Sequence, residues 1–241
     1  DITGANSATY TLTGITIAQN GYQYHVIVTG ACPGTVTSNN VTLTVGNAPS
    51  ITTQPADLTV CEGVNADFTV AASGSGVSYQ WQVSTDGGGT YTDIAGATSA
   101  TYSVPATTAI SGNRYRVIVT SSSCATPSTS NAAILTVNAL PTITTQPTSA
   151  TLCAGSDVTF TSAATGTNIA YQWQVSTDGG TTFTDIAGAT SATYSITGVT
   201  TTLNAYQYHV VVSGTCTPAA TSNAATLNVV SPATVTTQPA N

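Results

Sequence analysis

The side chains best suited to chemistry in this chain are its five cysteines, which recur at a fixed spacing. Two sets keep the same step of 92 residues. We call Cys32, Cys124 and Cys216 the late cysteines, and Cys61 and Cys153 the early cysteines. Thiols in such a pattern form disulfides, bind zinc or stay reduced. Zinc is disfavoured because no CxxC pair is present.

An early and a late cysteine that lie 63 residues apart fall within one period of the repeat. The repeat therefore predicts the disulfides Cys61–Cys124 and Cys153–Cys216, with Cys32 pairing upstream of residue 1. Reduced structural thiols stay open as the alternative. Closing a loop of this size stabilises a fold by about 4 kcal/mol in the chain-entropy model. A disulfide in every period is typical of an oxidising, extracellular setting.

The other side chains that could do chemistry do not form complete catalytic sets. Nucleophilic catalysis needs Ser or Cys beside His and an orienting acid, and residues 49–140 contain no histidine. His25 and His209 occupy one place of the period, where the middle copy has Arg116, and we expect all three on the solvated face of a strand. The acids lie mostly in turns, away from any paired-carboxylate arrangement: Asp57, Asp67, Asp86 and Asp93. We predict no enzyme, no cofactor and no metal site.

Residues 84–91 and 176–183 are similar to the Asp-box of sialidase-type propellers, a motif that braces a hairpin. By this resemblance Asp86 and Asp178 accept hydrogen bonds from the N–H groups of their turns. Calcium is the alternative ligand, but one carboxylate with carbonyl groups is a poor cage for this cation.

Exposed aromatic side chains are the one feature that could bind sugars. Tyr22 and Tyr206 lie on the strand face opposite Tyr24 and Tyr208, and the middle copy has Asn113-Arg114 near that place. A lone tyrosine more often packs against a loop, so carbohydrate contact is the lesser hypothesis. Isopeptide cross-links are excluded because the chain has no lysine.

Composition limits the partners of the chain. Its 241 residues carry a net charge of −7 with only two basic side chains. Nucleic acids and anionic membrane surfaces both require clusters of Lys and Arg. No run of 18 apolar residues exists for a transmembrane helix, and the N-terminus has no signal-peptide pattern. Alternating Val, Ile, Tyr, Phe and Thr favour strands over disorder.

The elements that position these residues repeat as well. The string TTQP occurs at 52–55, 144–147 and 236–239, with the same 92-residue step. This period suits an all-β sandwich that folds by itself better than a solenoid unit. The predicted division is part of a module at 1–48, whole modules at 49–140 and 141–232, and the first strand of another at 233–241. Proline at each joint favours semi-rigid linkers and an extended rod: Pro49, Pro141 and Pro232.

Within residues 49–140, apolar and polar side chains alternate as in strands with one buried face. We expect a first edge strand from Ile51 to Cys61, a second around Phe68, a third centred on Trp81, and a late strand around Val117. No segment shows a helical apolar period, so helix is expected to be nearly absent.

This order resembles the immunoglobulin-like sandwich, with its core tryptophan and its tyrosine corner. The matching core residues are Trp81, Trp173, Tyr24, Tyr115 and Tyr208. The chain departs from the family at the inter-sheet cysteine positions, which hold Val70 with Val117 and Ser162 with Val210. The displaced cysteines, with TTQP, VCEG, YQWQVSTDGG and SNAATL, resemble tandem repeats of giant secreted surface proteins of Bacteroidetes. Many of those proteins carry gliding-motility or type IX secretion domains.

The repeat and the resemblance imply a structural function. We expect a stalk or filament segment of a large, adhesin-like extracellular protein at the cell surface, acting as a disulfide-stapled spacer. One alternative is a carbohydrate-binding accessory region of a secreted hydrolase. Another is a filament protomer whose segment 1–48 is completed by a strand of a neighbour. Equivalent cut points in the repeat favour a piece of a longer chain. Expected partners are neighbouring modules or copies of the protein, then surface glycans or other cells.

Overall fold

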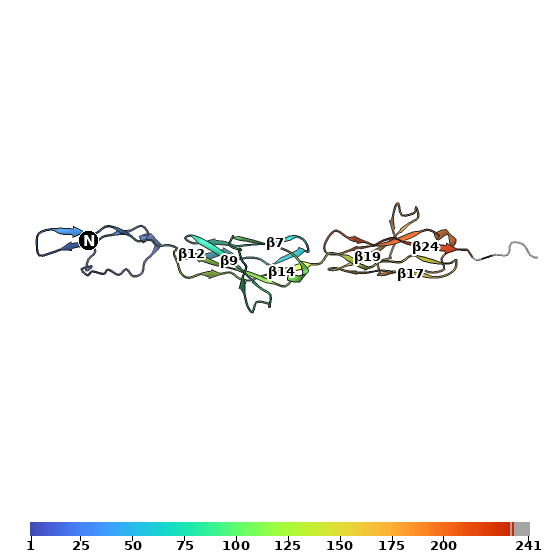
Figure 1. The fold of residues 1–241 in the computed structure, drawn as a ribbon, viewed down its shortest axis with the longest axis horizontal. Coiled ribbons are helices and arrows are strands. Elements are labelled where there is room, and N and C mark those ends of the chain that lie inside the picture. The colour runs from blue at the N-terminus through green and yellow to red at the C-terminus, as the bar shows by residue number, and fades with distance from the viewer. Residues whose placement is uncertain (232, 234–241) are drawn as a thin grey trace, which may run out of the picture. The chain divides into compact units, whose positions relative to one another are not determined.

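The computed structural model describes residues 1–231 and 233, which form strands and three single-turn 3-10 helices (Figure 1). The strand that we predicted at 233–241 falls outside the described residues, except for residue 233. None of the helices in the described part is long and apolar enough to cross a membrane. Since the described residues form strands and only short 3-10 helices, the prediction of an all-β chain is confirmed.

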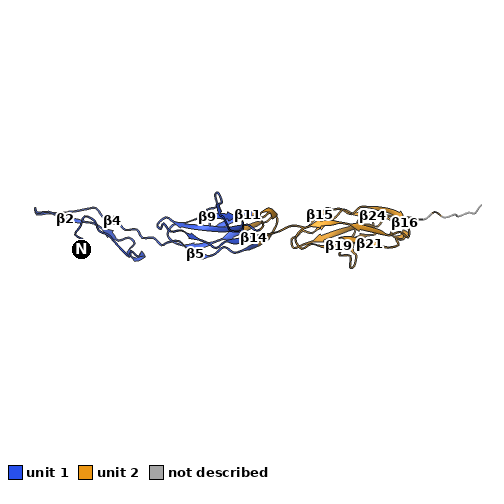
Figure 2. Cartoon of the chain, turned by 90° about the horizontal axis from the view of Figure 1, so that it is seen from below, with its two compact units in different colours: residues 1–58, 67–104, 112–135 blue, residues 59–66, 105–111, 136–241 orange. Residues whose placement is uncertain are grey.

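The chain divides into two compact units (Figure 2). The first unit holds 1–58, 67–104 and 112–135, and the second holds 59–66, 105–111 and 136–241. The boundary between the units passes through the sandwich of residues 49–140. We call residues 49–140 the first repeat and residues 141–232 the second repeat.

Residues 1–48 form two short ladders and bury none of their side chains. Strand β1 pairs with β4, and β2 pairs with β3, both antiparallel. The predicted core residue Tyr24 is only partly buried, because this segment has no counterpart of the strands that cover Tyr115 in the first repeat. The elements are η1 (Ile17–Gln19), β1 (Gln23–Tyr24), β2 (Ile27–Thr29), β3 (Thr35–Thr37) and β4 (Val41–Thr42).

The first repeat has a main sheet with the strand order β10-β9-β12-β14-β6, to which β13 adds beside β12. The pairs β5-β8 and β7-β11 make the facing layer. The strands are β5 (Ser50–Thr53), β6 (Leu58–Cys61), β7 (Asn65–Thr69), β8 (Ala71–Ser73), β9 (Val77–Ser84), β10 (Thr92–Asp93), β11 (Thr101–Pro105), β12 (Arg114–Ser121), β13 (Ser128–Thr129) and β14 (Ala133–Asn138), with η2 (Thr108–Ile110) before β12.

The expected single strand from Ile51 to Cys61 is wrong, because the chain forms two strands there that belong to different sheets. β5 pairs with β8, whereas β6 joins the main sheet beside β14. Pro55 lies between them, buried and without an N–H for a ladder. The crossing places Cys61 at the end of β6 in the main sheet.

The second repeat has the same arrangement, with the main sheet β16-β24-β22-β19-β20, β23 beside β22, and the pairs β15-β18 and β17-β21. Its elements are β15 (Thr142–Thr145), β16 (Ala150–Cys153), β17 (Val158–Thr161), β18 (Ala163–Thr165), β19 (Ala170–Ser176), β20 (Thr184–Asp185), β21 (Thr193–Ile196), η3 (Thr201–Leu203), β22 (Gln207–Ser213), β23 (Ala220–Thr221) and β24 (Ala225–Val230).

Aromatic side chains fill the space between the layers of each sandwich. Trp81 and Trp173 are fully buried, and Tyr115 and Tyr208 are nearly so, as predicted for core residues. In the second repeat, Phe160 stacks on Tyr208 with ring centroids 4.9 Å apart. Its core also holds Val158, Val199, Val210, Val212, Ala225, Leu227 and Val229.

Candidate functional site

The covalent chemistry of the described chain is one disulfide, which joins Cys61 to Cys216 with their Cα atoms 5.7 Å apart. Both cysteines belong to the second compact unit. The predicted pairs Cys61–Cys124 and Cys153–Cys216 are wrong, because the early cysteine of the first repeat binds the late cysteine of the second. Cys32, Cys124 and Cys153 are free. The upstream partner expected for Cys32 stays a prediction.

The strand directions of one sandwich explain why its own two cysteines do not meet. In the second repeat, β16 runs parallel to β24 and aligns Cys153 with Val230. β22 runs antiparallel to β24 and aligns Gln207 with Thr226, so that Cys216 lies beyond the opposite end of the sheet. The rise of a strand places the two cysteines roughly 40 Å apart. A disulfide requires Cα atoms within about 7 Å.

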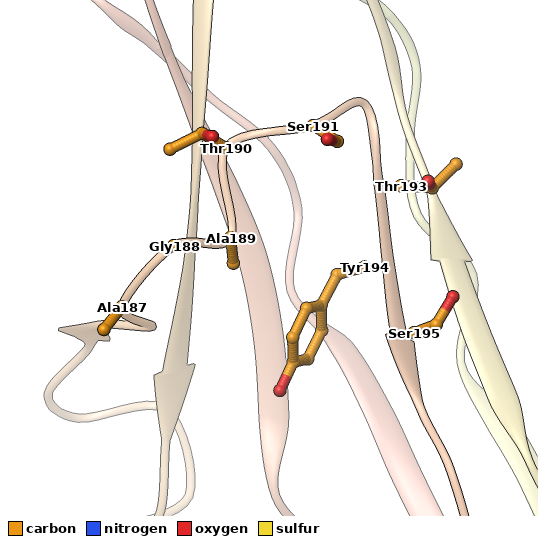
Figure 3. A pocket seen from close by; sticks show the side chains of 8 residues that line it. All are labelled: Ala187, Gly188, Ala189, Thr190, Ser191, Thr193, Tyr194 and Ser195. Atoms are coloured by element: carbon orange, nitrogen blue, oxygen red, sulfur yellow. The ribbon is translucent and has the colours of Figure 1, made fainter.

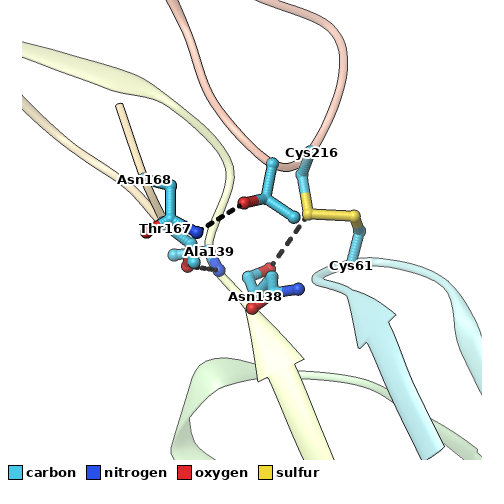
Figure 4. Close-up of a disulfide and its surroundings, with 7 residues drawn as sticks. Cys61, Asn138, Ala139, Thr167, Asn168 and Cys216 are labelled. Atoms are coloured by element: carbon cyan, nitrogen blue, oxygen red, sulfur yellow. Dashed lines mark hydrogen bonds between the residues drawn. A yellow bond between two sulfur atoms is a disulfide. The ribbon is translucent and has the colours of Figure 1, made fainter. Parts of the chain in front are cut away.

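The disulfide lies where β14 ends and the second repeat begins (Figure 4). The carbonyl oxygen of Asn138 accepts a hydrogen bond of 2.9 Å from the N–H of Glu62, next to Cys61. The same oxygen lies 3.5 Å from Sγ of Cys216. A disulfide sulfur carries no proton, so this is a packing contact between sulfur and oxygen. Asn138 therefore contacts Cys216 and the residue that follows Cys61.

Hydrogen bonds of the adjoining loops hold Cys216 in this position. The N–H of Ala139 donates to Oγ1 of Thr167 at 2.9 Å, and the N–H of Thr167 donates back to the carbonyl of Ala139 at 3.2 Å. Nδ2 of Asn168 donates to Oγ1 of Thr215 at 3.1 Å (Figure 4). The late cysteine thus follows a loop that is fixed to the residues after β14.

The hairpin after β9 is braced by its aspartate, as the Asp-box resemblance implies. Ser84 Oγ donates to Asp86 Oδ1 at 2.6 Å, and Thr90 donates both its N–H and its hydroxyl to Oδ2, at 2.9 and 2.7 Å. Gly87 and Gly88 provide the positive φ angles of this turn, 77° and 102°. Asp178 is bound in the same way by Ser176 and Thr182.

These hydrogen bonds also decide the charge of the turn carboxylates. The hydroxyl of Ser84 and then the two donors of Thr90 hold the pKa of Asp86 well below its usual range. The hydroxyl and the N–H of Thr182, and then Ser176, do the same to the pKa of Asp178. Since protein donors already occupy the carboxylate oxygens, the turns are built as braces. Among the described residues no group of three His, Cys, Asp or Glu side chains could hold a metal ion.

The outer face of the main sheet carries a stacked pair in each repeat, where only solvated side chains were expected. The guanidinium of Arg116 lies 3.8 Å from the ring centroid of Tyr91. At the same place His209 stacks on Phe183, with ring centroids 3.8 Å apart and the planes 8° from parallel. The sequence signal was the aromatic residue that ends the Asp-box in both repeats. His25 is exposed and contacts Asn40.

Amide side chains fix these pairs to the sheet. Gln82 accepts from Nε of Arg116 at 2.8 Å and donates to Asp93 at 2.8 Å. Gln174 accepts from Nε2 of His209 at 2.6 Å and donates to Asp185 at 2.7 Å. Burial lowers the pKa of His209.

A shallow pocket of about 220 Å³ lies beside the loop between β20 and β21 (Figure 3). The first repeat has a pocket at the corresponding residues. Uncharged side chains line both, and the tyrosines Tyr194 and Tyr102 are the only titratable groups in them. The second-repeat lining is Ala187, Gly188, Ala189, Thr190, Ser191, Thr193, Tyr194 and Ser195. These groups contain no acid–base or nucleophilic set.

The aromatic side chains considered for sugar binding differ in their exposure to solvent. Tyr22 is 53% exposed, whereas Tyr206 is partly buried and packs against the core of the second repeat. Asn113 and Arg114 are partly buried at the start of β12. An aromatic platform shared by the repeats is therefore not built at these positions.

Known structures share the fold. An I-band fragment of titin superposes with a TM-score of 0.60 at 14% identity, covering 90% of this chain and 76% of the fragment. The structure of IG1 and IG2 of DIP-gamma gives a TM-score of 0.51 at 14% identity, covering 75% of this chain and 97% of that one. At such low identities the similarity concerns the fold, which is the tandem immunoglobulin-like sandwich predicted from the sequence.

One sequence relative is Endoglucanase C of Cellulomonas fimi, which is 37% identical over 184 residues. The match covers 75% of this chain but only 16% of the length of that enzyme. A family model described as "Domain of unknown function (DUF8696)" matches residues 50–139 and 142–231, one stretch in each repeat. Because these stretches make up most of the 241 residues, the chain belongs to the DUF8696 family and carries two tandem immunoglobulin-like copies of its domain.

Proposed function

We propose that this chain is a disulfide-stapled spacer segment of a large, adhesin-like protein at the cell surface. The observation that carries the proposal is the bond between Cys61 and Cys216, which crosses from one family domain to the next. A bond at that place keeps the joint closed when the chain is pulled from its ends. Disulfides persist in oxidising compartments, which supports an extracellular location. The setting we propose is a giant surface protein of the Bacteroidetes type that the repeats resemble.

Single-molecule stretching tests the mechanical part of this function. When the oxidised chain is pulled by its two ends, the disulfide carries the force past residues 62–215. These residues then add nothing to the length of the stretched chain. Reduction should therefore add roughly 500 Å to the length of the unfolded chain. The C61S variant should reach the longer length without reductant, and C153S should behave like the unaltered chain. Equal lengths before and after reduction would contradict the proposal.

A second function, a polysaccharide-contacting accessory region of a hydrolase, is favoured by one specific observation. The relative with 37% identity is an endoglucanase, and this chain covers only a small part of it. Incubation with insoluble cellulose and with soluble β-glucans tests the idea, using Y22A as the variant because Tyr22 is the most exposed of the aromatic candidates. If the chain is an accessory region, the polysaccharide should remove it from solution, and it should remove the Y22A variant less. A spacer stays in the supernatant in every case.

A further inference from the structure

The joint before the first repeat is built like the disulfide-bearing joint, although it lacks the disulfide. Cys124 is the late cysteine of the first repeat, and its free thiol donates to the carbonyl oxygen of Gly46 at 3.3 Å. At the corresponding place, the disulfide sulfur of Cys216 packs against the carbonyl oxygen of Asn138 at 3.5 Å. Gly46 and Asn138 lie 92 residues apart, as the two cysteines do.

The hydrogen bonds around the two joints also correspond. In the first unit, the N–H of Asn47 donates to Oγ of Ser75 at 3.0 Å, and the N–H of Ser75 donates back to the carbonyl of Asn47 at 3.2 Å. Ala139 and Thr167 make the same reciprocal pair in the second unit. Cys124 therefore has the same surroundings as Cys216, but residues 1–48 contain no early cysteine that could bond to it.

Cys153 is the early cysteine of the second repeat, and it lies at the place that Cys61 occupies in the first repeat. It ends β16, where it aligns with Val230 at the end of β24, and the next N–H, that of Ala154, donates to the carbonyl of Val230 at 3.0 Å. Cys61 ends β6 in the same way, with the N–H of Glu62 bound to Asn138 at 2.9 Å. Cys153 is exposed and free, whereas Cys61 is bonded.

We propose that Cys124 and Cys153 are half-sites of the disulfide seen between Cys61 and Cys216. Cys153 takes the late cysteine of a repeat joined directly after its own, and Cys124 takes the early cysteine of a repeat joined directly before. Each bond forms when two thiols lose two protons and pass two electrons to a disulfide oxidant. A thiol–disulfide oxidoreductase or glutathione disulfide serves as that oxidant and leaves as two thiols. The bond always crosses a joint and never closes within one repeat.

This inference rests on the cysteine positions and holds for a spacer as well as for an accessory region. Its test lengthens the full chain by one repeat, inserting a copy of residues 144–235 after Val235, so that a TTQP string follows Val235 and its copy alike. In the added copy, serine replaces the early cysteine, so that Cys61 and Cys153 are the only early thiols. The added copy also carries T215S, which keeps the hydroxyl group but changes the mass of the peptide with the late cysteine.

The lengthened chain is oxidised in a glutathione buffer, its free thiols are alkylated, and its disulfides are mapped by mass spectrometry without reduction. We expect Cys61 bonded to Cys216 and Cys153 bonded to the late cysteine of the added copy. A matched chain whose added late cysteine is serine should leave Cys153 fully alkylated. Cys153 bonded to Cys216, Cys153 free in the first chain, or Cys153 bonded between two molecules would each overturn the proposal.

Discussion

The indole Nε1–H of Trp173 donates a hydrogen bond of 2.9 Å to the carbonyl oxygen of Ser191, which ties the core of the second repeat to the loop after β20. Trp173 is fully buried. W173F removes the donor and part of the ring volume, so the second repeat should lose about 2 kcal/mol of its free energy of unfolding. Urea unfolding followed by near-UV circular dichroism measures this loss.

The first repeat provides the matched comparison. Trp81 donates to the carbonyl oxygen of Ser99 at the same distance, 2.9 Å, and is equally buried. W81F should therefore cost its own repeat a similar amount. If both variants unfold within about 0.5 kcal/mol of the unaltered chain, which is the scatter of ordinary surface substitutions, the bond does not stabilise the loop.

The disulfide between Cys61 and Cys216 closes a loop with a sequence separation of 155 residues. In the chain-entropy model such a closure contributes up to about 5 kcal/mol. C61S and C216S should each lower the urea midpoint of the oxidised protein, and by the same amount, because either change removes the whole bond. C124S and C153S should leave the midpoint unchanged, since both thiols are free. A loss in C124S equal to that in C61S would indicate pairing within the first repeat.

Residues 1–48 expose apolar side chains that the whole repeats bury. Val28 is 58% exposed, whereas Val119, at the corresponding place in β12, is fully buried. Segments with few buried contacts open at low cost in free energy. Brief chymotrypsin digestion should therefore cleave after Tyr22 and Tyr24 before it cleaves after Tyr208, as N-terminal sequencing of the fragments will record. Cleavage at Tyr208 as fast as at Tyr24 would show that the buried state of Tyr208 does not protect it.

The sandwich core could be predicted from the sequence because alternation fixes which side of a strand is buried. Trp81, Tyr115 and Tyr208 follow directly from that pattern. The disulfide could not be predicted in the same way, since a repeat reveals spacing but not the end of the sheet at which each cysteine lies. The parallel pairing of β16 with β24 decides this point. That pairing depends on the chain crossing from one sheet to the other between β15 and β16, which alternation does not predict.

The stacked pairs of the outer face could be predicted only in part. Alternation indicates that Arg116 and His209 point away from the core, as they do. It does not reveal that a hairpin folds Tyr91 and Phe183 over the same face. That contact depends on the turn held by Asp86 and Asp178, whose role was predicted correctly from the Asp-box resemblance.

His209 makes the stability of the second repeat depend on pH. Its Nε2–H donates to Gln174 and its ring lies flat on Phe183, and burial lowers its pKa below the usual value of 6.5. The unfolded chain therefore binds the proton more readily than the folded chain. The stability that the folded state gains by keeping His209 neutral is complete above pH 6.5. It is lost as the pH falls through the lowered pKa of His209 in the folded state.

The first repeat suggests the variant that tests this dependence, because Arg116 occupies the place of His209 and stacks on Tyr91. H209R carries a fixed positive charge and should make the midpoint of thermal unfolding nearly constant between pH 7 and pH 4.5. The unaltered chain should lose stability over that range. H25Q serves as the control for removal of a histidine, because His25 lies outside the second repeat. A profile of H209R that falls as steeply as that of the unaltered chain would assign the dependence to another group.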